Sequence, residues 1–215
     1  MTEQTSTGPR DRYRQQVRSE VRERAWEQIA EAGASALSLK AIAKQMGMTA
    51  PALYRYFASR DDLLTELILA AYRDLAGVVE AAAGAEGTAG TDGTAAARLT
   101  AIAQAFRAWA LANTQRYLLI YGTPVPGYKA PPEATALASR IFAPIVAGFS
   151  AAFSPARPAA APPSGPDQAV WRSLTFWTRL HGVISLEVAG HFNGMPFDPA
   201  LLYAEEVESV VADRR

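Results

Sequence analysis

A threonine, an arginine and two tyrosines stand close together between Thr49 and Tyr56. These side chains suit contact with a nucleic acid, because an arginine fork matches O6 and N7 of guanine and hydroxyl or basic groups bind phosphate oxygens. We predict base contacts from Thr49, Ala50, Pro51 and Arg55, and phosphate contacts from Lys40, Tyr54, Tyr56 and Arg60. The alternative is that the two tyrosines pack against the first helix of the chain.

The first of two short helices expected around these residues begins after Ser38. Its apolar residues recur at helical spacing and form one face, at Leu39, Ile42, Ala43 and Met46. Ser38 is suited to cap its start, and Gly47 its end, because glycine adopts a left-handed conformation at little cost.

The second helix carries the predicted contact residues. Thr49 is expected to cap it, Pro51 is tolerated in its first turn, and Leu53 and Phe57 are expected to face inward. Two short helices joined by a tight turn indicate a helix-turn-helix, whose second helix enters the major groove of DNA.

The N-terminal part of the sequence resembles the DNA-binding domain of TetR-family transcriptional regulators, from about Val17 to about Tyr72. The motifs that carry the resemblance, in the family's order and spacing, are Ala41-Ile42-Ala43, Gly47-Met48-Thr49, Leu53-Tyr54-Arg55-Tyr56-Phe57 and Ser59-Arg60-Asp61-Asp62-Leu63-Leu64. The family usually has a lysine where this chain has Arg60, so the positive charge is kept.

Charge is distributed unevenly although the net charge is +0. Residues 1–60 hold ten Lys or Arg and six Asp or Glu, whereas the rest of the chain holds 11 and 15. A basic N-terminal part on an acidic body is typical of a DNA reader with a separate regulatory part. Chance segregation of charges on a solvated surface is the alternative.

Composition excludes several other classes of protein. The chain has no cysteine, which excludes disulfides and thiolate metal sites. We expect no signal peptide, and no apolar run approaches the roughly 20 residues of a membrane helix. No nucleophile elbow, zinc-protease motif or dinucleotide fingerprint is present, so we expect neither enzymatic activity nor a cofactor.

The rest of the sequence favours an all-α fold of about nine helices. We predict a disordered polar tail over residues 1–13, a helix-turn-helix domain over 14–75, and a ligand-binding and dimerisation domain over 76–215. Ser59 is expected to cap the fourth helix in a capping box with Asp62. Loops are expected over 84–94 and 154–166, and a helix from Asp167 to about Gly190 is apolar on every side.

The C-terminal half resembles a TetR subgroup named for a Trp-His-Gly signature. The motifs are the segment from Tyr117 to Tyr128, Trp177-Thr178-Arg179-Leu180-His181-Gly182 and Ser185-Leu186-Glu187. The resemblance implies a homodimer built from the last two helices and an apolar cavity in each regulatory part. We assign dimer contacts to Leu180, Ile184, Val188, Val207 and Val211.

Aromatic residues of the C-terminal half form the candidate effector site. They are Trp109, Tyr117, Tyr121, Phe142, Phe149 and Trp177, joined by His181. The competing interpretation makes each of them a plain core residue, and makes His181 a hydrogen-bonded histidine in the core or at the dimer seam. With only two histidines and no cysteine, a metal site is not expected. Glu187 is expected to be exposed or paired across the dimer.

We therefore expect a homodimeric, ligand-responsive regulator, a repressor released from a near-palindromic operator. Its partners would be double-stranded DNA, a second copy of itself and a small apolar or aromatic effector, with no membrane; it would be cytoplasmic and on the bacterial nucleoid when bound to DNA. The alternatives are a helical carrier or enzyme with a DNA-binding appendage, and a DNA binder without effector.

Overall fold

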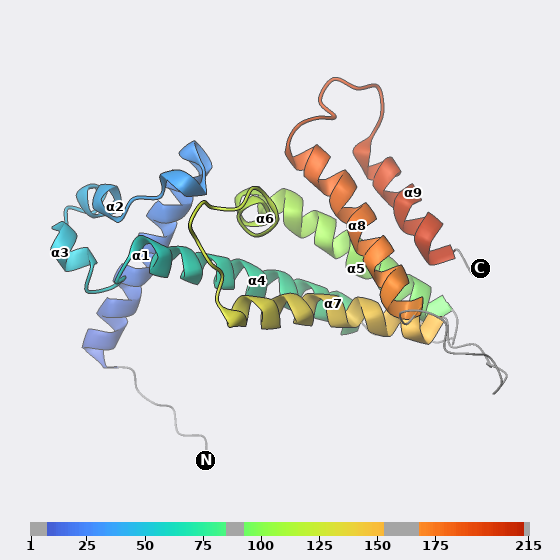
Figure 1. Ribbon diagram of the computed structural model, residues 1–215, viewed down its shortest axis with the longest axis horizontal. Helices are drawn as coiled ribbons and strands as arrows, with labels where there is room; N and C mark the ends of the chain where they lie inside the picture. The colour runs from blue at the N-terminus through green and yellow to red at the C-terminus, as the bar shows by residue number, and fades with distance from the viewer. Residues whose placement is uncertain (1–7, 85–92, 153–167, 213–215) are drawn as a thin grey trace, which may run out of the picture. The chain divides into compact units, whose positions relative to one another are not determined.

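The computed structural model of the protein describes residues 8–84, 93–152 and 168–212. Within these ranges the chain is all-α and holds no strand, which confirms the predicted fold class. The elements follow in the order α1 (Pro9–Ala32), the 3-10 helix η1 (Ala34–Ala36), α2 (Leu39–Gln45), α3 (Ala50–Leu53), α4 (Arg60–Gly84), α5 (Gly93–Ala112), α6 (Thr114–Tyr121), α7 (Pro132–Ala152), α8 (Gln168–Val188) and α9 (Pro199–Ala212) (Figure 1).

The chain divides into two compact units. The N-terminal unit comprises the described residues up to Ala70 together with Leu118–Pro131. The C-terminal unit comprises Ala71–Tyr117 and the described residues from Pro132 onward. The contacts between residues place the boundary of the units at residue 70, whereas the sequence analysis placed it after residue 75. They also assign Leu118–Pro131 to the N-terminal unit, which the sequence analysis did not predict.

Helix α1 supports the N-terminal unit with one apolar face. Its buried residues recur every fourth position, at Val17, Val21, Ala25 and Ile29. The helix begins at Pro9, a residue type favoured in a first turn, so part of the segment predicted as a polar tail is helical. The remainder of that predicted tail, residues 1–7, lies outside the described residues.

The predicted helix-turn-helix is present as α2 and α3. The Ser38 hydroxyl accepts from the Ala41 amide at 3.3 Å, and Gly47 has a φ of 66°, so both predicted caps of α2 are found. Thr49 occupies the N-cap position of α3, but its side chain makes no capping hydrogen bond. The predicted N-cap position is therefore confirmed, but without a capping hydrogen bond from the Thr49 side chain.

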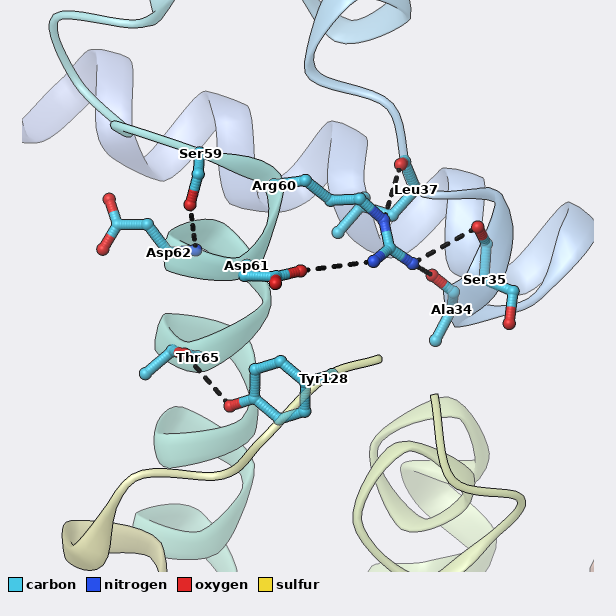
Figure 2. A network of polar contacts seen from close by, with 9 residues as sticks. All are labelled: Ala34, Ser35, Leu37, Ser59, Arg60, Asp61, Asp62, Thr65 and Tyr128. Atoms are coloured by element: carbon cyan, nitrogen blue, oxygen red, sulfur yellow. Dashed lines mark hydrogen bonds and ion pairs between the residues drawn. The ribbon is translucent and has the colours of Figure 1, made fainter. Parts of the chain in front are cut away.

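Helix α4 begins as the sequence indicated, with one difference. The Ser59 hydroxyl accepts from the Asp62 amide at 3.0 Å, as expected of a cap (Figure 2). The Asp62 carboxylate accepts from the Ala58 amide at 3.1 Å, one residue earlier than a standard capping box requires. Both charges of Asp61 and Asp62 lie in the first turn, where the helix dipole favours them.

The C-terminal unit packs α5 against α7, α8 and α9. Its core is formed by apolar residues of all four helices, including Leu99, Ile102, Phe106, Ile141, Ile145, Phe149, Phe176, Leu180, Ile184, Tyr203 and Val207. Gly148 permits the close approach of α7 to α5, because a Cβ there would lie 2.7 Å from Leu99. Helices α8 and α9 lie side by side and run in opposite directions (Figure 1).

Helix α8 is buried on one side only within a single chain, and its other side carries exposed apolar residues. Phe176, Leu180 and Ile184 are 0–1% exposed, whereas Trp171 is 63% and Leu174 44% exposed. The sequence pattern could not separate the two sides, because both carry large apolar residues.

Helix α7 is long and apolar enough to cross a membrane by length and composition alone, which the sequence analysis did not anticipate. In the C-terminal unit it packs against α5 and α8 and buries Leu137, Ile141 and Phe149. A core helix of this kind passes the same test, so the finding is weak evidence for a membrane span. The two predicted loops, over 84–94 and 154–166, fall mostly outside the described residues.

Candidate functional site

Helix α2, helix α3 and the turn after α3 expose most of the side chains that the sequence analysis assigned to DNA contact. The exposed positions are Lys40, Thr49, Pro51, Tyr54 and Arg55, and the half-buried ones are Ala50 and Tyr56. Tyr54 is 48% exposed, which argues against the interpretation that it is packed against the first helix. On the inner side, Leu53 and Phe57 are 0% exposed and anchor the segment in the N-terminal unit.

The guanidinium of Arg60, for which the sequence analysis predicts a phosphate contact, also binds groups within the protein. Its guanidinium donates to the backbone carbonyls of Leu37 (3.1 Å), Ala34 (2.9 Å) and Ser35 (3.3 Å), and pairs with Asp61 (3.3 Å) (Figure 2). These bonds tie the connection before α2 to the start of α4. Because most of its N–H groups face the protein, this geometry favours a structural role for Arg60 over a phosphate contact.

The sequence analysis did not identify Arg18, which contacts the turn after α3 on the inner side of the predicted DNA-contact residues, or Glu66, which pairs with Arg18. Arg18 of α1 donates to the carbonyl of Tyr56 at 2.5 Å and pairs with Glu66 of α4. The amphipathic pattern of α1 gave no signal for this, because it marks only apolar residues. The partners are 38 and 48 residues away in sequence, so only the fold brings them together.

In the C-terminal unit, four of the predicted effector residues lie in one cluster. The Tyr117 hydroxyl and Nδ1 of His181 are 2.9 Å apart, and the rings of Trp177 and His181 have centroids 4.5 Å apart. Phe142 contacts Trp177 edge-on, with ring centroids 6.4 Å apart. Phe106, which was not predicted, stacks on Trp177 at 4.9 Å and completes the cluster.

Two of the other predicted effector residues contact side chains that are not part of this cluster. The indole nitrogen of Trp109 donates to Asp74 at 2.9 Å, and Phe149 packs edge-on against Phe176 at 5.6 Å. Tyr121 belongs by its contacts to the N-terminal unit. Trp109 and Phe149 are at most 5% exposed and are therefore buried in the C-terminal unit.

Burial keeps the polar pair of the cluster uncharged near neutral pH. Burial lowers the pKa of His181 to about 4 and raises the pKa of Tyr117 to about 12. The two groups therefore present hydrogen-bonding capacity without charge inside an apolar surrounding. Among the described residues no group of three His, Cys, Asp or Glu side chains could hold a metal ion.

Glu187 is neither exposed nor free to pair across a dimer. Its carboxylate binds Arg107 of α5 through two hydrogen bonds of 2.9 and 2.5 Å, and the two side chains are 15% and 17% exposed. The prediction was wrong because the partner lies 80 residues away in sequence.

Three of the five predicted dimer residues are interior residues of a single chain. Leu180, Ile184 and Val207 are at most 2% exposed, so their side chains have almost no surface left for a second copy. Val188 and Val211 are half-buried. The exposed row on α8 consists instead of Trp171, Leu174, Thr178, Gly182, Ser185 and Leu186.

A groove of about 510 Å³ runs between α5 and α9. Its lining residues are Ala96, Thr100, Gln104, Ala204, Val207, Glu208, Val211 and Ala212. It shares no residue with the aromatic cluster, so it is a feature separate from the predicted effector site.

Two family descriptions match the chain. The family described as "Bacterial regulatory proteins, tetR family" matches residues 21–67, which contain α2, α3 and the start of α4. The description "Tetracyclin repressor-like, C-terminal domain" matches residues 99–210, which span most of the C-terminal unit.

Known proteins resemble the chain along nearly its whole length. The HTH-type transcriptional regulators Rv1816 of Mycobacterium tuberculosis and Mb1846 of Mycobacterium bovis are each 36% identical, over 99% of this chain and 98% of theirs. A crystal structure of the regulatory protein SCO4313 is 50% identical, with a TM-score of 0.80, and covers 95% of this chain and 100% of its own. FadR of Bacillus subtilis, solved with stearoyl-CoA, is 14% identical with a TM-score of 0.65 over 90% and 97% of the two chains, and shares the fold.

Replacing Arg55 tests whether the exposed residues of α3 and the turn after it contact DNA bases. Arg55→Ala is expected to cost about 1–3 kcal/mol of DNA binding and to relax the preference at one base pair per half-site, because the guanidinium fork is lost. Titration against a set of single-base variants of the selected DNA measures both effects. Lys44→Ala, an exposed basic residue of α2, is the control and should leave base preference unchanged. Unchanged specificity in Arg55→Ala would falsify its role in base reading.

Lowering the pH tests the burial of His181. The unfolded chain takes up a proton near pH 6.5, whereas the folded chain resists it until about pH 4. The stability that neutral His181 contributes is therefore complete above pH 6.5 and is lost as the pH falls toward 4, by at most about 3 kcal/mol. Denaturant unfolding across this range should show a flatter profile for His181→Gln than for the wild type. His191→Gln, the same change at an exposed position, is the control, and an equal flattening there contradicts the assignment to His181.

Proposed function

The chain belongs to the TetR family of helix-turn-helix transcriptional regulators, and from this premise we propose that it is a homodimeric repressor released from its operator by a small apolar or aromatic effector. The observation that carries the proposal is the outward-facing row Thr49, Pro51, Tyr54 and Arg55, on a turn anchored by buried residues. Such a row can meet base edges and phosphates while its inner side stays in the core.

Each subunit would place α3 in a major groove of double-stranded DNA. Arg55 has the donor geometry for a guanine, with Thr49, Ala50 and Pro51 close to neighbouring base edges. Lys40, Tyr54 and Tyr56 would bind phosphates and set the register on the duplex without reading sequence. Two such readers in a two-fold dimer require an operator with near-palindromic half-sites about one helical turn apart, or slightly more.

The exposed row on α8 is the proposed dimer surface. Trp171 and Leu174 are large apolar residues at 63% and 44% exposure, and Thr178 and Gly182 follow at helical spacing. A contiguous row of this kind is uncommon on the surface of a monomer and typical of an association site. Helix α9 lies beside α8, so the two helices together could pair with those of a second copy.

The effector would bind next to the aromatic cluster of Tyr117, Phe142, Trp177 and His181. Apolar rings surround an uncharged Tyr–His pair there, which favours an uncharged or apolar compound with a group able to accept or donate one hydrogen bond. The FadR structure with stearoyl-CoA supports this, because in that protein the same fold accommodates a ligand with a long apolar chain. Release by about 100-fold requires that the effector prefer the released state by about 2.7 kcal/mol.

We also propose a subgroup and a cellular location for the protein. Trp177, His181 and Gly182 support membership of the Trp-His-Gly subgroup of TetR regulators. As a DNA-binding regulator without catalytic activity, it would work in the cytoplasm and on the bacterial nucleoid. The acidic balance of the C-terminal part keeps non-specific DNA contact to the basic N-terminal part.

A charge on the exposed row of α8 tests the dimer. Leu174→Asp should convert a dimer into a folded monomer, because the side chain lies outside the core of one chain, and operator affinity should fall at least about tenfold as two half-sites are no longer held together. Sedimentation and thermal unfolding measure the two effects. Leu111→Asp, at a leucine of α5 with similar exposure (39%), should stay dimeric. A dimeric Leu174→Asp would overturn this surface; Ile184→Asp is unsuitable, because it buries a charge.

An operator-release assay tests the effector site. The full-length protein first selects its DNA from a random pool, and apolar and aromatic compounds are then screened for release. Trp177→Phe should shift the response to an active compound by about tenfold, because the indole ring is lost, and should leave operator affinity without compound unchanged. Phe149→Leu, outside the cluster, serves as the control and should respond like the wild type. No release by any compound would leave a DNA binder without effector.

A further inference from the structure

Arg18 joins three elements of the N-terminal unit through one guanidinium. From α1, one terminal nitrogen donates to the backbone carbonyl of Tyr56 at 2.5 Å, in the turn that follows α3. The other terminal nitrogen pairs with the carboxylate of Glu66 on α4. The guanidinium also lies over the ring of Phe57, 4.3 Å from its centroid. One side chain thus links the turn after α3 to both α1 and α4.

The location of the Tyr56 carbonyl makes this contact consequential. Tyr56 lies in the turn that follows α3, so a bond to its carbonyl fixes the backbone that presents Tyr54 and Arg55. A helix as short as α3 has no cooperative stability of its own, so its direction must come from contacts with other elements. Arg18 supplies such a contact at the end from which Tyr54 and Arg55 project.

Shielding distinguishes this ion pair from others on the same helix. The side chains of Arg18 and Glu66 are 30% and 20% exposed, and Glu66 also accepts from Arg22 at 2.9 Å. The pair of Arg24 and Glu27 on α1 is 41% and 55% exposed. Charge-assisted bonds away from water are stronger than exposed ones, so the Arg18–Glu66 pair is the better suited to fix a geometry.

We propose that Arg18, oriented by Glu66, is a positioning residue for DNA reading: it fixes the direction of α3 and does not itself bind phosphate. Its charge counts toward the basic N-terminal part, yet its donors point into the protein. The inference rests on the proposed function, in which α3 reads the operator.

Two arginines one turn apart give a matched test of this role. Arg18→Met removes the contacts to both Tyr56 and Glu66, whereas Arg22→Met removes the same charge and a contact to Glu66 only. With the full-length protein and the double-stranded DNA that the wild type selects, Arg18→Met should weaken binding about tenfold and Arg22→Met by less than about threefold. The slope of log Kd against log salt should stay unchanged in Arg18→Met, because a lost phosphate contact would lower it by about one.

Glu66→Gln gives a test in which the two explanations predict opposite signs. If Arg18 acted only through its charge, removing a neighbouring carboxylate would strengthen DNA binding. If Arg18 positions α3, the weaker hold of a neutral amide should loosen DNA binding by about fivefold. Glu27→Gln makes the same charge change at the exposed pair on α1 and should not weaken binding. This variant also keeps the inference testable should Arg18→Met fail to fold.

Titration at high DNA concentration separates positioning from simple loss of folded protein. A positioning role raises Kd while the DNA-binding fraction of the protein stays that of the wild type, whereas unfolding lowers that fraction. Unchanged or tighter binding by Glu66→Gln, equal losses in the two methionine variants, or a reduced salt slope in Arg18→Met each overturn the inference. A wild type that selects no DNA would instead overturn the proposed function itself.

Discussion

A helix of one turn gains little from its own hydrogen bonds, because nucleation fixes several residues for a single bond. The reading helix α3 spans only Ala50–Leu53, so its existence depends on the burial of Leu53 and Phe57. Each contributes about 1.5–3 kcal/mol, well above the few tenths that separate ordinary residues in helix propensity. Because Leu53 and Phe57 are buried, the side chains on the opposite side of this segment face outward. Arg18 and Arg60 add direction, since they bind backbone carbonyls on either side of the helix-turn-helix.

In the C-terminal unit, polar side chains lie among apolar helices and are paired by hydrogen bonds. Arg107 and Glu187 satisfy each other through two bonds, and the Tyr203 hydroxyl donates to the carbonyl of Ala103 at 2.7 Å. Tyr117 and His181 are matched in the same way, and both stay uncharged near neutral pH because of burial. A charged group in this place would require a paired charge on any ligand. An uncharged pair does not require a charge on the ligand, so it is compatible with an apolar effector that forms one hydrogen bond.

The sequence indicated features that depend on a few consecutive residues. Ser38, Gly47 and Pro51 act where their backbone preferences demand, and the buried side of the helix-turn-helix follows from spacing alone. Features that depend on distant partners were out of reach: Arg60 meets carbonyls 23 to 26 residues away, and Glu187 meets Arg107. The apolar pattern of α8 was also insufficient, because the same residue types serve a core and an association surface. Periodicity shows that a side is apolar, but not whether the same chain covers it.

Helix α4 is continuous from Arg60 to Gly84, and both units hold it by side chains. In the N-terminal unit Glu66 binds two arginines and Thr65 is 3.0 Å from the Tyr128 hydroxyl (Figure 2). In the C-terminal unit Asp74 accepts from Trp109 and Arg116, and Glu80 pairs with Arg140. The Glu80 pair is exposed, and water screens such pairs, so this contact alone is a weak hold on α4. A ligand-driven change of α4 would therefore draw on its partly buried contacts, among them the bond of Trp109, which is 5% exposed, to Asp74.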